Sequence, residues 1–198
     1  MKKLGLFLLA TAALALLFSG SALAQGDLSY YFVTYYSNNV SGAPDATVRI
    51  INDGDTGGNL YAAFFVFDDS QEMQACGVCT ITPDGLLSED VKTQLANNTL
   101  TGKVPSRGVI KVFAFDFVLF APVPAAGLHG WATHIERATP TSGVYATTEA
   151  PLADSNLSEG EGTALFNLCN YLLELGSGRE PSPVPRKTAT SSLGGRYD

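Results

Sequence analysis

Three cysteines, Cys76, Cys79 and Cys169, are the residues whose type and spacing bear most directly on chemistry. Cys76 and Cys79 form a C-x-x-C pair. In a redox enzyme the first thiolate of such a pair attacks a disulfide and the second resolves the mixed disulfide. That chemistry usually sits where a strand leads into a helix N-terminus. Residues 80–83 (TITP) do not start a helix, so a thiol-disulfide oxidoreductase is an alternative interpretation and not the favoured one.

The same cysteines also fit a structural disulfide. Cys169 falls on the apolar face of a predicted helix, so a bond to Cys76 or Cys79 ties that helix to the end of a central strand. A Cys76–Cys79 bond closes only a small ring. Zinc is not favoured, because it needs four ligands and His129 and His134, five residues apart, face opposite sides of a strand. The sequence favours a structural disulfide and leaves its pairing open.

Acidic residues cluster in two loops that could hold calcium. Asp53 and Asp55 lie in the glycine-rich run 53–58, and Asp68 and Asp69 follow a long apolar run. Hard oxygen ligands at alternate positions suit calcium. The first loop lacks the bidentate Glu of an EF-hand, and turns between strands favour Asp and Gly for their own reasons. Calcium is therefore the single cofactor that we consider. The alternative interpretation is that both loops are ordinary turns.

Aromatic residues suggest a possible binding surface. Tyr30, Tyr35 and Trp131 could line a sugar-binding face, although aromatics at strand spacing are more often core residues or cross-strand pairs. The sequence contains no G-x-S-x-G elbow, H-E-x-x-H helix or P-loop. We assign no catalytic residue.

The elements that must position these residues are mostly strands. Runs rich in aromatic and β-branched residues, bounded by turn residues, cover 28–36, 46–51, 60–67, 107–120 and 131–135. The run 60–67 is apolar at both parities, which is expected of a central strand covered on both faces. Residues 88–97 carry a weak pattern for a short helix. We expect an all-β fold, an immunoglobulin-like β-sandwich in general architecture.

One helix, 158–175, is predicted to pack on this sandwich. Ser158 and Glu161 fit a capping box, apolar residues then recur at helical spacing, and Gly176 supplies the stop. Residues 176–198 are rich in Gly, Ser, Pro and Thr, which is typical of a flexible tail. The domain is predicted to span residues 25–175.

The N-terminus predicts export. Two lysines precede the apolar run 4–18, and Ala22-Leu23-Ala24 offers a small-residue cleavage site, as in a secretory signal peptide of residues 1–24. That run is shorter than the ~20 residues of a membrane span. We therefore expect a protein of the periplasm or cell exterior, without a membrane span after cleavage, in a compartment where disulfides form.

The domain is acidic. Residues 25–175 hold 17 Asp and Glu against six Lys and Arg, and the whole chain has a formal net charge of −7. Such a surface repels phosphate backbones, so nucleic acid is not an expected partner. The ordinary interpretation is a solvated surface that keeps an exported protein in solution.

Several motifs together resemble a group of uncharacterised secreted bacterial proteins. They are VRIIN (48–52), FVFD (65–68), the C-x-x-C pair, TPDGL (82–86), NNTLTG (97–102) and GSG (176–178). Members of the group often carry further cysteines beside the first of the pair and after the GSG, where this chain has Ala75 and Glu180. The resemblance implies export and a disulfide-bearing fold, and it implies no activity.

These observations favour an exported, non-catalytic structural or binding protein with a protein or glycan partner. The first alternative is a carbohydrate- or calcium-dependent binding module. The second is a thiol-disulfide oxidoreductase that uses the C-x-x-C pair.

Overall fold

The computed structural model describes residues 29–38, 44–98, 100–139 and 144–176. The predicted signal peptide lies outside the described residues, as does the predicted tail beyond Gly176. Within the described part of the chain, no helix is long and apolar enough to cross a membrane.

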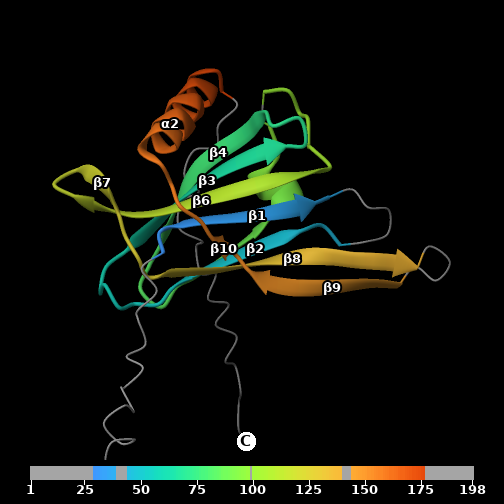
Figure 1. Cartoon of the computed structure of the whole chain (residues 1–198), viewed down its shortest axis with the longest axis horizontal. Coiled ribbons are helices and arrows are strands. Elements are labelled where there is room, and N and C mark those ends of the chain that lie inside the picture. The colour runs from blue at the N-terminus through green and yellow to red at the C-terminus, as the bar shows by residue number, and fades with distance from the viewer. Residues whose placement is uncertain (1–28, 39–43, 99, 140–143, 177–198) are drawn as a thin grey trace, which may run out of the picture.

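The protein is mostly β, with two antiparallel sheets and one long helix (Figure 1). Sheet A has the strand order β10 (Ala153–Asp154), β1 (Tyr31–Ser37), β6 (Arg107–Val118), β3 (Leu60–Asp68) and β4 (Met73–Ile81), and β7 (Ala121–Pro124) pairs with β6. Sheet B has the order β5 (Leu86–Asp90), β2 (Thr47–Asn52), β8 (Leu128–Thr139) and β9 (Val144–Pro151). A helical turn, η1 (Val91–Leu95), follows β5, and the helix α2 (Glu159–Glu174) ends the described chain.

Strand β3 shows how the layers are built. Its even-numbered side chains from Leu60 to Val66 lie in the inter-sheet core, the cluster of buried residues shared by both sheets. Its odd-numbered side chains, including Ala63 and Phe65, lie in a second cluster, the helix-side core, together with Leu165 and Cys169 of α2. Successive strand residues point to opposite faces, so a strand apolar at both parities needs a cover on each side. Sheet B supplies one cover and α2 the other, as the prediction for residues 60–67 required.

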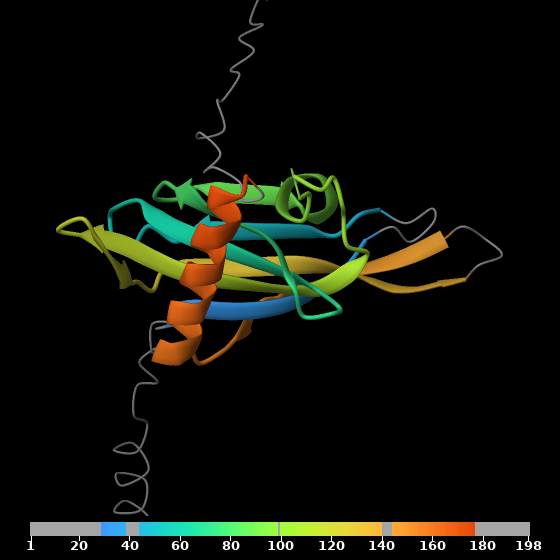
Figure 2. The same ribbon diagram turned by 90° about the horizontal axis from the view of Figure 1, so that it is seen from above.

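The helix α2 lies across sheet A, on the face away from sheet B (Figure 2). Ser158 caps it, its side chain accepting a hydrogen bond from the Glu161 amide at 3.2 Å, which is the serine half of the predicted capping box. Glu161 also ties this first turn to the sheet. Its Oε1 accepts hydrogen bonds from the Tyr31 hydroxyl at 2.7 Å and from Lys111 Nζ at 2.6 Å.

These contacts shift the pKa values of Glu161 and Tyr31. The hydrogen bond from Lys111, with a second from Tyr31, lowers the pKa of Glu161 below its usual value of 4.5. Burial, with the neighbouring Glu161 carboxylate, raises the pKa of Tyr31 above its ordinary range. The carboxylate is therefore held in its charged form where the helix meets the sheet.

The five predicted strands and the C-terminal helix are present, with β8 longer than expected. Two predictions are wrong in detail. Residues 88–97 do not form a regular helix, because Ser88–Asp90 pair with β2 and only η1 is helical. The C-x-x-C pair does not lie at the end of a central strand but within β4, the next strand of the chain, which pairs with β3.

The hairpin joining β6 to β7 has an unusual turn. Val118 pairs with Ala121, so Leu119 and Phe120 form a two-residue connection, and their φ angles are 51° and 68°. Positive φ at both positions defines a type I′ turn, which Asn-Gly favours and bulky residues disfavour. The two side chains are 91% and 99% exposed, so the turn gains little burial in return.

Replacing this turn by its preferred sequence should stabilise the fold. A left-handed conformation costs a non-glycine residue about 1–2 kcal/mol, and Asn and Gly tolerate it best. We expect Leu119→Asn/Phe120→Gly to raise the free energy of unfolding by about 1–2 kcal/mol. Denaturant unfolding of the variant and the wild type measures the difference, and a less stable variant would contradict the strained turn.

The Glu161 contact predicts a pH dependence. A carboxyl whose pKa is lowered by folding stabilises the protein above its unfolded pKa, and that contribution disappears as the pH falls through the folded pKa. We expect Glu161→Gln to be less stable than the wild type at neutral pH, with the difference vanishing in acid. Unfolding curves between about pH 3 and 7 test this. Glu159→Gln, which removes the same charge in the same helical turn, should show a smaller effect at neutral pH.

Candidate functional site

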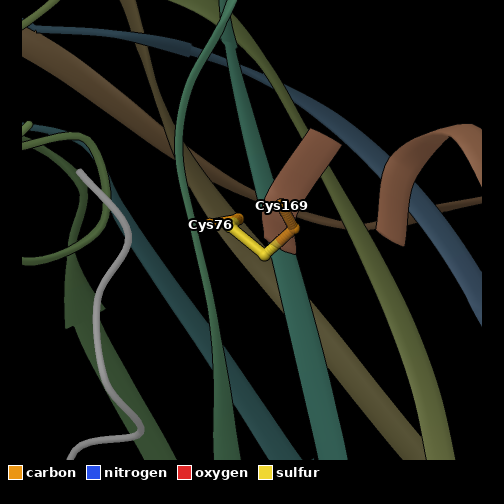
Figure 3. Close-up of a disulfide and its surroundings, with 2 residues drawn as sticks. All are labelled: Cys76 and Cys169. Carbon is orange, nitrogen blue, oxygen red and sulfur yellow. A yellow bond between two sulfur atoms is a disulfide. The ribbon is translucent and has the colours of Figure 1, made fainter. Parts of the chain in front are cut away.

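A disulfide joins Cys76 of β4 to Cys169 of α2, with 5.7 Å between the Cα atoms (Figure 3). Both residues are buried in the helix-side core, 2% and 7% exposed. The bond therefore fixes α2 to sheet A, and it confirms one of the two pairings that the helix pattern suggested. The expectation that the helix is anchored to the end of a central strand is wrong. The anchor is β4, at the edge of sheet A.

Cys79 takes no part in this bond. It packs against the inter-sheet core, whereas Cys76 lies in the helix-side core. Residues three apart in a strand point to opposite faces, so the Cys79 thiol and the disulfide are on different sides of sheet A. Resolution of a mixed disulfide needs two neighbouring thiols, so this arrangement does not favour the oxidoreductase interpretation.

Tyr35, Asp68 and Asp69, which the sequence suggested for separate reasons, lie around one open pocket. The Tyr35 pocket has a volume of 330 Å³ and lies where the end of β1 and the end of β3 meet the start of β6. Its lining residues are Tyr35, Tyr36, Asp68, Asp69, Gln71, Arg107, Gly108 and Val109. The volume is at the lower end of the range of small-molecule sites.

The close approach of β6 and β3 shapes this pocket. A Cβ atom at Gly108 would lie 1.8 Å from the Phe67 carbonyl oxygen, so only glycine allows the two strands to come together here. The register then places Gly108 opposite Asp68 on one side and Tyr36 on the other. The Tyr36 hydroxyl donates to the Phe67 carbonyl at 3.1 Å.

The two carboxylates of the Tyr35 pocket differ in their roles. Asp68 is buried, and its oxygens accept hydrogen bonds from the Ser70 and Glu72 amides and from Gln74 Nε2. It therefore organises the turn after β3, as an Asp at a strand end commonly does. Asp69 is exposed and accepts a hydrogen bond from Arg107 Nε at 2.8 Å, which lowers the pKa of its carboxyl.

Exposed aromatic and ionic groups of the pocket face solvent. Tyr35 is 57% exposed, and its ring stacks on His134 of sheet B with 4.1 Å between centroids. Arg107 and Asp69 expose 71% and 51% of their side chains. A pocket with one aromatic ring and one ion pair offers both an apolar contact and polar groups for orientation. Arg107 was not singled out from the sequence, where it appears only as the first residue of a predicted strand.

The other candidate calcium ligands lie elsewhere. Asp53 precedes β3, and its carboxylate contacts His129 Nε2 at 3.1 Å and accepts the Asp55 amide at 3.0 Å. The two acidic loops flank the nine-residue β3, so they are about 26 Å apart and cannot share an ion. Among the residues that the structure describes, no three His, Cys, Asp or Glu side chains are grouped so as to hold a metal. Calcium stays a prediction from the sequence.

Tyr30 and Trp131 do not join the Tyr35 pocket. The ring of Tyr30 packs edge-on against Phe113 of sheet A at 6.0 Å and is 36% exposed. Trp131 is half-buried and borders a separate pocket of 130 Å³ with His129, Pro151 and Asp154 among its lining residues. The three aromatics named from the sequence therefore do not form one flat surface.

The geometry defines a two-sheet, mostly β protein with one helix attached by a disulfide and an open pocket at one end of sheet A. No protein-family model matches the chain, and no curated protein matches it. Among solved structures, the chain is similar to the crystal structure of Thermotoga maritima 1070. That match has 16% sequence identity and a TM-score of 0.39, and it covers 68% of this chain and 99% of that one.

Loss of the disulfide should destabilise the protein strongly. The bond closes a loop with a sequence separation of 93, for which chain entropy gives about 4–5 kcal/mol of stabilisation. We expect Cys169→Ser to lower the free energy of unfolding by about this amount. Cys79→Ser removes a thiol of the same chemistry without breaking the bond, and it should cost much less. Equal losses in the two variants, measured by denaturant unfolding, would contradict the assignment.

Proposed function

We propose that this chain is an exported, non-catalytic binding protein that holds a glycan in the Tyr35 pocket. The observation that carries this proposal is the arrangement of an exposed tyrosine ring beside the Asp69–Arg107 ion pair in an open pocket. One face of a sugar ring carries C–H groups that pack on an aromatic ring. Its hydroxyls need donors and acceptors at the rim, which a carboxylate and a guanidinium supply.

The rigidity of the pocket supports binding. Tyr35, Arg107 and Asp69 come from the ends of paired strands and the turn that Asp68 organises. Groups fixed before the ligand arrives lose little conformational entropy on binding. The sequence favours a structural or a binding protein equally. The pocket supports binding over a structural role without a ligand.

Export is part of the proposal. The predicted signal peptide and the Cys76–Cys169 disulfide are both consistent with an oxidising compartment, such as the periplasm or the cell exterior. The proposed architecture is an immunoglobulin-like β-sandwich in its general form, two antiparallel sheets over a common core.

A glycan microarray probed with the labelled protein tests the proposal. We expect binding to a defined set of glycans, at least tenfold weaker for Tyr35→Ala because the apolar contact is lost. Arg107→Ala should weaken it through the loss of a charged donor. Tyr30→Ala, which removes a partly exposed tyrosine outside the pocket, is the matched control. An array without any bound glycan, or equal binding by Tyr35→Ala, would overturn the glycan assignment.

A further inference from the structure

The end of the β6–β7 hairpin is the most exposed apolar part of the described chain. Leu119 and Phe120 are almost fully exposed, and the adjoining Phe117, Val118 and Val123 are 48%, 52% and 42% exposed. We call these five side chains the hairpin tip. Figures 1 and 2 both place this hairpin at one end of the molecule, projecting beyond the body. An apolar group of this kind usually marks a contact surface.

The turn gives a second, independent reason to assign the tip a role. Leu119 and Phe120 adopt positive φ, which neither residue type favours, and neither is buried in compensation. Strain of this kind tends to persist at functional sites. A fold that needed only a tight turn would be better served by Asn-Gly.

The tip is poorly suited to a protein–protein interface. The five side chains expose roughly 500–600 Å², less than the roughly 800 Å² that each partner contributes to a stable interface. Strand addition is also disfavoured, because Pro122 and Pro124 remove donors from the edge strand β7. A second copy of the chain, with its net charge of −7, would moreover be repelled.

The surroundings of the tip fit a lipid bilayer without net charge. Asp116 is the only charged residue between Val112 and Gly127, so the tip offers no Lys or Arg to anionic headgroups. Behind the tip, Tyr61 packs edge-on against Phe117 at 4.8 Å. A tyrosine with an apolar ring and a polar end suits the boundary between acyl chains and water.

From these observations we propose that the hairpin tip inserts Leu119 and Phe120 into the surface of a zwitterionic lipid bilayer. A fluid bilayer can adapt its shape to Leu119 and Phe120, whereas a protein partner would need a preformed pocket for them. Each large apolar side chain that is inserted strengthens binding by about tenfold or more. The tip lies about 35 Å along β6 from the Tyr35 pocket, so both sites can be occupied together.

Co-sedimentation with phosphatidylcholine vesicles tests this proposal. The full chain is purified from the exported fraction with its N-terminus determined, and every variant is prepared in the same way. We expect wild-type protein to partition to the vesicles, and Leu119→Asn/Phe120→Gly to bind at least tenfold less while its melting temperature is equal or higher. Leu86→Asn removes an apolar side chain that is 59% exposed on sheet B, and it should bind as wild type does.

Four outcomes would overturn the proposal. The first is absence of wild-type binding, and the second is equal binding by the tip variant. The third is a wild-type dimer that the tip variant loses, seen by analytical ultracentrifugation, which would assign the tip to a second copy. The fourth is stronger binding when phosphatidylglycerol is added, because the proposal assigns the bilayer no net charge. The glycan array uses a different site, so either result is interpretable without the other.

Discussion

Sheet A is apolar on both faces, and the rest of the structure depends on keeping both faces from water. A central strand such as β3 buries side chains of both parities. Burial of each large apolar side chain contributes about 1.5–3 kcal/mol. Exposure of either face would therefore strongly lower the free energy of unfolding. Sheet B covers one face with an extensive surface. The other face depends on the single helix α2, which is why a covalent bond and the Glu161 contact both hold it there.

Double burial also fixes the register of the strands. A shift by one residue would exchange the two cores of β3 and β6, so their pairing is specified more strictly than in a sheet with one wet face. β6 lies between β1 and β3 and extends beyond both toward β7. Its start therefore holds Arg107 beside Asp69, while its end carries the exposed turn. The single strand β6 therefore positions an ionic pocket and an apolar turn at the two ends of sheet A.

Elements with a local signal could be predicted from the sequence, and those that depend on a distant partner could not. The helix followed from its cap and its periodicity, and β3 from its continuous apolar run. β4 has a glycine, two cysteines and no alternation of apolar and polar residues. It forms a strand because its backbone pairs with β3. Tyr35 and Asp69 could be named singly, but their meeting with Arg107 depends on register. The turn at Leu119 and Phe120 was not predicted, because both residues end the apolar run 107–120 and neither type is typical of a turn.

The position of Cys79 has a consequence for how the chain acquires its correct covalent structure. During synthesis Cys76 and Cys79 emerge together, long before Cys169, so the nearest thiols are the wrong ones to join. Once β4 pairs with β3, the strand turns these two thiols to opposite faces and separates them. Cys76 is then left on the face where α2 will dock. Formation of the sheet therefore disfavours a Cys76–Cys79 disulfide. It leaves Cys76 available to bond with Cys169 when α2 docks.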